Sequence, residues 1–155
     1  MNLPPEIAAA CAPLFSQLPL DQAMPHLVGS HPTQTDLIET IVSNPVIAAK
    51  PALASALWLY GSDLDRSHTI SQGIEDSTGS FWHGIMHRRE GDFSNSHYWM
   101  RRAARHPLMA APTDLDPDGF IDEVAAANGT DKPELVAKQR AEWLVLFEYC
   151  ANSGD

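Results

Sequence analysis

The stretch WHGIMHRREGDFSNSHYWMRR, residues 82–102, places three histidines, four arginines and two tryptophans in 21 consecutive positions. Its central Gly91-Asp92 pair is typical of a turn, and the sequence on each side has apolar residues at the three- and four-residue spacing of an α-helix. The stretch therefore predicts a helical hairpin at about residues 80–106, with polar stripes rich in histidine and arginine.

The hairpin has a spacing of small residues similar to that of a tetratricopeptide repeat, which is a two-helix unit. The residues that carry this similarity are Gly84, Gly91, Phe93, Ala103 and the closing Pro107. Ser96 stands where an alanine is usual, and no convincing second copy lies about 34 residues away on either side. We therefore expect one tetratricopeptide-like hairpin rather than a repeat protein.

One stripe of the first predicted helix carries His83, His87 and Glu90, beside its apolar face. Two imidazoles one helical turn apart can bind one metal ion, and a carboxylate three residues later can complete a facial set of ligands. His68, on the preceding predicted helix, is the natural fourth ligand. The candidate site for a divalent transition metal is therefore His68, His83, His87 and Glu90. The alternative is that these histidines form hydrogen bonds at a half-buried interface.

The region from Ser80 to Pro107 is positively charged, although the net charge of the chain is −10. Its five arginines outnumber its two acids, Glu90 and Asp92, so this region carries +3 and the rest of the chain −13. Arginine side chains bind phosphate and carboxylate groups well. The candidate residues for binding a small anionic ligand or an acidic peptide are Arg88, Arg89, His97, Arg101 and Arg105. The alternative is that the arginines pair with the acidic C-terminal third of the chain.

Helical patterns cover the rest of the chain, and no segment alternates with the period of a β-strand. Further helices are expected at about residues 4–18, 33–44, 46–60, 62–73, 117–127 and 131–150. The candidate N-terminal caps are Thr33, Ser62, Thr78 or Ser80, and Asp131 with Glu134. Pro51 either splits the apolar segment 46–60 or begins its helix.

The expected fold class is all-α, a compact array of about seven helices in a single domain over residues 1–155. A hydrophobic content of 44% and four tryptophans indicate a packed globular chain. The parts of this domain are N-terminal helices with a connector (1–45), central His/Arg-rich helices (46–107) and acidic C-terminal helices (108–155).

Composition also indicates where the protein acts and what it does not bind. The sequence shows neither a secretory signal near Met1 nor a run of the roughly 18–20 apolar residues that would span a bilayer. Cys11 and Cys150 lie far apart without metal-ligand spacing, which is typical of buried thiols in a reducing compartment. The acidic net charge disfavours nucleic-acid binding. We expect a cytoplasmic protein without a membrane or nucleic-acid partner.

Three segments carry a resemblance: LWLYGSDLDRSHTISQGI, TGSFWHGIMHRREGDFSNSHYWMRR and QRAEWLVLFEYC. Together they resemble a family of uncharacterised helical proteins, over about residues 52–150. The resemblance implies a helical fold and assigns no activity, substrate or cofactor. It draws attention, without giving roles, to Asp65, His68, Gln72, His83, His87, Arg88, Arg89 and Glu90.

Three functions follow from these patterns. The first is a binding domain that holds a small anionic ligand or an acidic peptide on a face lined by histidine and arginine. The second is a metal-dependent enzyme that uses His68, His83, His87 and Glu90. The third is a purely structural interaction domain. Binding is the first expectation, because the sequence contains no complete catalytic set.

Overall fold

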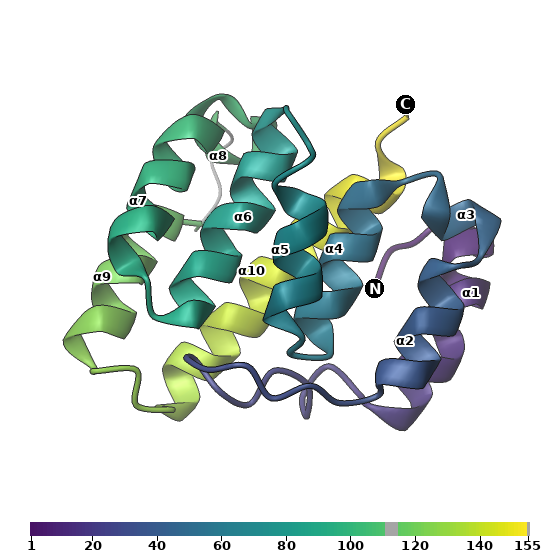
Figure 1. Ribbon diagram of the computed structural model, residues 1–155, viewed down its shortest axis with the longest axis horizontal. Coiled ribbons are helices and arrows are strands. Elements are labelled where there is room, and N and C mark those ends of the chain that lie inside the picture. Colours follow the sequence, from purple (N-terminus) through teal and green to yellow (C-terminus); the bar gives the residue numbers. More distant parts are fainter. Residues whose placement is uncertain (111–114, 155) are drawn as a thin grey trace.

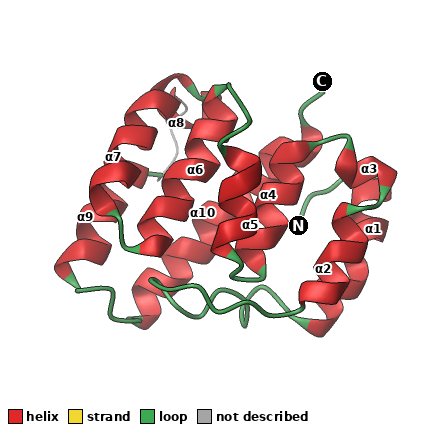
Figure 2. Cartoon of the chain, viewed as in Figure 1, coloured by secondary structure: helices red, strands yellow, loops and turns green. Residues whose placement is uncertain are grey.

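The computed structural model describes residues 1–110 and 115–154, and these parts of the chain form helices and loops without a strand (Figure 2). Helices make up 69% of the described residues. The all-α prediction is confirmed. Ten α-helices and one 3₁₀-helix lie in the described ranges, more than the seven or so expected, and the short helices at residues 45–48 and 107–110 were not predicted as separate elements.

Prolines begin several helices, since their fixed φ suits the first turn and the missing N–H has no helical partner there. Three such helices are α1 (Pro5–Gln17), α3 (Pro45–Ala48) and α4 (Pro51–Tyr60). Pro51 therefore both splits the segment 46–60 and begins its main helix. The short α8 (Pro107–Ala110) likewise starts at the proline that was expected to close the hairpin.

Most helices begin close to the predicted caps but use a different residue. Aspartates cap four of them, α5 (Leu64–Ser71), α6 (Ser77–Glu90), α7 (Phe93–Arg102) and α9 (Pro117–Ala126). These caps are Asp63, Asp76, Asp92 and Asp116, and each accepts a hydrogen bond from the backbone N–H three residues on. The predicted caps Ser62, Thr78 and Ser80 were wrong by one to four residues.

Two further predicted caps were also wrong. Gln34, in the left-handed conformation, precedes α2 (Thr35–Val42) in place of Thr33. Lys132 precedes α10 (Pro133–Asn152), whereas Asp131 instead accepts hydrogen bonds from the connector between α1 and α2.

Helix α4 lies in the middle of the molecule, with α10 crossing it on one side and α5 packed on another (Figure 1). Residues 53–60 of α4 are all buried, as its nearly continuous apolar sequence requires. The α10 side chain Trp143 donates a 2.9 Å hydrogen bond to the carbonyl of Ala56 and stacks on Phe147. Helices α1, α2 and α3 form a separate group at one end of the molecule (Figure 1).

Helices α6 and α7 form the predicted hairpin, and the 3₁₀-helix Ala103–Arg105 continues α7. Gly91 ends α6 with a φ of +86°, a conformation that favours glycine. Gly84 lies against Met100, so a side chain there would meet the Met100 methyl at 2.9 Å. The hydroxyl of Ser96 donates a 2.6 Å hydrogen bond to the Gly84 carbonyl, which explains a polar residue at this close crossing. The likeness of this α6–α7 hairpin to a tetratricopeptide repeat stays a prediction.

The connector between α1 and α2, residues 18–34, runs along one edge of the molecule (Figure 1). It is held by partners far away in the sequence. The amide of Gly29 donates to the Arg89 carbonyl at 2.7 Å, and the amide of Leu27 donates to Asp131 at 2.7 Å. Gln139 of α10 donates to two carbonyls of the connector at 3.1 Å. The connector thus joins α6 to the start and middle of α10.

A small second core lies under this connector, where α9 meets α10. Its buried residues are Leu27, Phe120, Val124, Leu135 and Val136. Within residues 1–110 and 115–154, no helix combines the length and the apolar character needed to cross a membrane.

Candidate metal centre

Helices α5 and α6 pack side by side (Figure 1). Three histidines come together between them. His68 comes from α5, and His83 and His87 are one turn apart on α6. The ring centre of His68 lies 4.8 Å from that of His83 and 5.3 Å from that of His87. One nitrogen of each ring lies within 4.8 Å of those of the other two. The structure therefore brings together three of the four predicted metal ligands.

The Nε2 atoms of His83 and His87 are 2.9 Å apart. Two nitrogens bound at about 2.1 Å to one ion would be about 3.0 Å apart at the 90° angle of octahedral coordination and about 3.4 Å apart at a tetrahedral angle. The observed separation is therefore close to what a shared metal ion requires. A hydrogen bond between the two nitrogens has the same length, so in the metal-free protein one proton occupies this position.

Glu90 lies on the opposite side of the His87 ring from this pair. Its Oε2 is 3.0 Å from Nδ1 of His87, the ring nitrogen turned away from His83, and the role of Glu90 as a metal ligand stays a prediction. An ionised carboxylate only accepts hydrogen bonds, so Nδ1 of His87 is the donor, which in the neutral tautomer leaves the lone pair on Nε2. This arrangement is typical of a carboxylate that orients a metal-binding histidine from behind.

Glu90 also belongs to a second group of potential ligands, with His87 and Asp92. This group lies at the exposed end of α6, where Glu90 is exposed and Asp92 caps α7. Since Asp92 already accepts hydrogen bonds from the backbone and side chain of Asn95, this group is the weaker of the two.

The environment of His83 keeps its imidazole neutral. The residue is only 2% exposed and its ring stacks on Trp99 of α7, with 4.1 Å between ring centres. Burial, followed by the proximity of His87 and His68, lowers the pKa of His83 to about 4. A neutral imidazole is the form that binds metal. Its Nδ1 is buried without a hydrogen-bond partner among the described residues, an uncommon state that can mark a functional site.

Access to the three histidines differs. His87 is 7% exposed, close to the 2% of His83, whereas His68 is half-buried. The cluster thus meets solvent on the α5 side. Trp99 forms its inner wall, and sequence reasoning did not assign it to the site, because an aromatic residue at helical spacing is as typical of a core position.

Arg88 and Arg89 lie inside the protein rather than on the predicted ligand-binding face. Arg88 is 0% exposed, pairs with the buried Glu142 of α10 at 2.7 Å and lies over the ring of Phe120. Arg89, also 0% exposed, donates to the carbonyl of Leu59 at the end of α4 and to the hydroxyl of Ser62. These two arginines fasten α6 to α4, α9 and α10, and so fix the position of the histidines.

Burial has a clear electrostatic effect on Arg89. It lowers the pKa of Arg89 to about 9, with the adjacent Arg88 charge as a second cause. The carbonyls at the C-terminal end of α4 favour the charge that Arg89 brings to them.

The remaining predicted ligand-binding residues lie on several surfaces. His97 contacts the α9 residues Asp118 and Asp122 at 2.8 and 3.0 Å, one with each ring nitrogen. Arg101 lines one hollow, beside Asp116 and Asp118. Arg105 lines another, of about 470 Å³. The structure therefore does not bring the five residues onto one face.

Comparison of the chain with models of known protein families, with curated proteins and with solved structures found no match. Its function is therefore inferred from the residues themselves.

Proposed function

We propose that the protein binds a divalent transition metal through His68, His83 and His87, with Glu90 orienting His87. The observation that carries this proposal is the convergence of three imidazoles from two helices, two of them with Nε2 atoms 2.9 Å apart. Imidazole nitrogens suit zinc, iron, copper and nickel. Stacking on Trp99 fixes the His83 ring before any ion arrives.

The proposed ligand set is that of a catalytic rather than a structural site. Structural zinc sites have four protein ligands, whereas catalytic sites have three and leave a position for water or substrate. Three histidines with an accessible side at His68 fit the second class. A metal held this way can lower the pKa of a bound water and polarise a substrate oxygen. We therefore propose a metal-dependent enzyme in which Glu90 holds the proton on Nδ1 of His87.

Elemental analysis of the untagged protein, purified without chelator, tests this proposal. We expect near-stoichiometric transition metal in the wild type and none in the His83→Ala/His87→Ala variant. The matched control is His26→Ala/His31→Ala, a second histidine pair whose ring centres lie 4.6 Å apart in the connector. This control should keep its metal.

A wild-type protein that carries no metal and gains no melting temperature from added zinc, iron or manganese would contradict the proposal. Equal loss of metal in the two double variants would show non-specific binding to histidine, which contradicts it as well. Loss in the His83/His87 variant alone supports it, provided that circular dichroism shows an unchanged helix content.

One observation favours anion binding as a second candidate function. The exposed side chains Arg102 and Arg105 line the 470 Å³ hollow together with the hydroxyl-bearing Ser77 and Ser80 at the start of α6. Neither arginine forms an ion pair within residues 1–110 and 115–154, although the Arg102 guanidinium lies over the rings of Tyr98 and Trp99. Glu75 and Asp76 also line this hollow and would weaken the binding of a highly charged anion.

Phosphate or sulfate should then raise the melting temperature more than sodium chloride of equal ionic strength, because only a bound anion acts on the native state by mass action. The Arg102→Ala/Arg105→Ala variant should lose this increase. Arg101→Ala, whose side chain faces a different hollow, should keep it. An equal increase with sodium chloride would show general screening instead of a site.

We also propose a cytoplasmic location. Cys11 and Cys150 are both buried and neither forms a disulfide, which suits a reducing compartment.

A further inference from the structure

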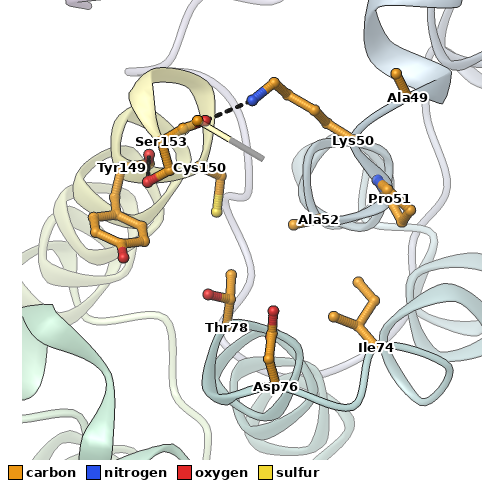
Figure 3. A pocket seen from close by; sticks show the side chains of 11 residues that line it. Ala49, Lys50, Pro51, Ala52, Ile74, Asp76, Thr78, Tyr149, Cys150 and Ser153 are labelled. Atoms are coloured by element: carbon orange, nitrogen blue, oxygen red, sulfur yellow. Dashed lines mark hydrogen bonds between the residues drawn. The ribbon is translucent and has the colours of Figure 1, made fainter.

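A cavity of about 300 Å³ lies between the start of α4, the start of α6 and the end of α10 (Figure 3). It is separate from the histidine cluster, with which it shares no residue. Its walls are formed by residues 49–52, by Ile74, Asp76 and Thr78, and by Tyr149, Cys150, Ser153 and Gly154. This volume is at the lower end of the range of about 300–1,000 Å³ for small-molecule sites, so the cavity suits a ligand of few heavy atoms.

Two opposite charges line this cavity without neutralising each other. The ammonium of Lys50 donates a 2.6 Å hydrogen bond to the carbonyl of Ser153, where it caps the end of α10. Across the cavity, the carboxylate of Asp76 caps α6 through the amide of Gly79. No ion pair joins Lys50 to Asp76 among the described residues. Each charge therefore keeps capacity for an outside partner of opposite sign.

A thiol also lines the cavity, between these two charges (Figure 3). The sulfur of Cys150 points into it from α10 (Figure 3). Burial raises the pKa of this thiol to about 12, and the nearby indole of Trp82 partly opposes this increase. Among the smaller effects, Asp76 raises the pKa and Lys50 lowers it. At neutral pH the thiol is therefore uncharged and adds a weakly polar surface.

Uncharged groups complete the lining. The side chains of Ala52 and Ile74 form an apolar wall between the two charges (Figure 3). On the other side lie the hydroxyls of Thr78 and Tyr149, which form no side-chain hydrogen bond within residues 1–110 and 115–154. A bound molecule can thus meet an apolar surface on one side and two free hydroxyls on the other.

We propose that this cavity binds a small zwitterion of the amino-acid class, with its ammonium at Asp76 and its carboxylate at Lys50. A simple anion would be repelled by Asp76, and a simple cation by Lys50, so neither satisfies both ends. A molecule that carries both charges a few bonds apart pairs with each. The apolar wall then favours a small aliphatic side chain over a charged one.

Calorimetric titration of the full-length protein with L-alanine and L-valine tests this inference. We expect saturable binding of both. L-alaninamide has no carboxylate for Lys50, and N-acetyl-L-alanine has no ammonium for Asp76. Each should bind at least about ten-fold more weakly, the equivalent of losing one charge-assisted hydrogen bond.

Two variants test the residues themselves. Asp76→Asn retains an acceptor for the Gly79 amide but removes the charge, and Lys50→Gln removes the ammonium; each should abolish L-alanine binding. The matched controls are Asp116→Asn, which alters the same type of cap in α9, and Lys138→Gln, whose ammonium pairs with Glu123. Both controls should bind like the wild type.

Absence of heat or of a melting-temperature increase with both amino acids would overturn the inference. Equal binding of L-alanine, its amide and its N-acetyl form would overturn it too, and this comparison needs no variant. The His83→Ala/His87→Ala protein should bind L-alanine like the wild type, so failure of the metal proposal leaves this result unaffected.

Discussion

In α6, His83 and Arg88 are 2% and 0% exposed, whereas in the neighbouring α7 both Arg101 and Arg102 are exposed. The two helices contain nearly the same types of polar residue. Their environments differ because α6 is packed on α4, α5 and α7, while α7 has only α6 and α9 as main neighbours. A helix enclosed on most sides can satisfy its polar groups only through other groups of the protein. A helix at the surface can leave them in water.

The contrast between α6 and α7 teaches that a helix rich in histidine and arginine is not thereby a binding site. In α6, buried cations hold the helix and buried imidazoles converge. In α7, the arginines are exposed to solvent, and His97 contacts Asp118 and Asp122 of α9 through its two ring nitrogens. The following predictions test this difference, in order of decreasing expected effect.

The largest difference is expected between the arginines of the two helices. Arg88→Ala leaves the buried carboxylate of Glu142 without its partner, which should lower the free energy of unfolding by about 3–5 kcal/mol. Arg101→Ala removes an exposed charge and should change it by less than about 0.5 kcal/mol. Urea denaturation measures both.

Replacement of the whole pair sharpens this prediction. Arg88→Met/Glu142→Leu should recover most of the loss, since no unpaired charge stays buried. If Arg88→Ala and Arg101→Ala cost the same, the burial of α6 described here is incorrect.

The tryptophans should show a smaller contrast. Trp82 of α6 is 0% exposed, whereas Trp99 of α7 is half-buried. Trp82→Ala should therefore cost about 3–5 kcal/mol of unfolding free energy. Trp99→Ala should cost about 1–2 kcal/mol. In addition, Trp99→Ala should weaken metal binding, because its ring stacks on His83; Trp99→Phe should restore it.

The smallest effect concerns pH. Hydrogen bonds and charge from Asp118, and then from Asp122, raise the pKa of His97, since only the protonated ring donates to both carboxylates. Its stabilising contribution is complete below the ordinary histidine pKa of about 6.5 and is lost as the pH rises through the raised value. The advantage of the wild type over His97→Gln should therefore be larger at about pH 5.5 than at about pH 8.5.

The size of this change is limited by solvent, because the side chain of His97 is 26% exposed and its partners more so. We expect less than about 1 kcal/mol from denaturation at the two pH values. An advantage that grows with pH would contradict the assignment of a protonated His97.

Much of the helical content follows from local signals. Prolines mark where α1, α3, α4 and α10 begin, and Gly91 marks the end of α6, because these effects depend on one residue's own backbone. The caps were less predictable. Several possible acceptors lie near each helix start. Asp131 accepts a hydrogen bond from the Leu27 amide of the connector instead of capping α10.

The candidate site likewise combines features that follow from local sequence with features that depend on distant residues. His83 and His87 can be paired from helical spacing alone, and the short link between α5 and α6 brings His68 to them. The burial of Arg88 depends on Glu142, which lies 54 residues away on another helix. No local pattern in the sequence specifies such a partner.

The connector of residues 18–34 has a consequence for how the protein folds. Its hydrogen bonds to Asp131, Gln139 and Arg140 span 104 to 117 residues of sequence. They can form only after α10 has docked, whereas α4–α5 and α6–α7 can associate through short loops. We therefore expect the connector to be the last segment to order and the first to open, with the Leu27 amide exchanging its hydrogen before those of α4.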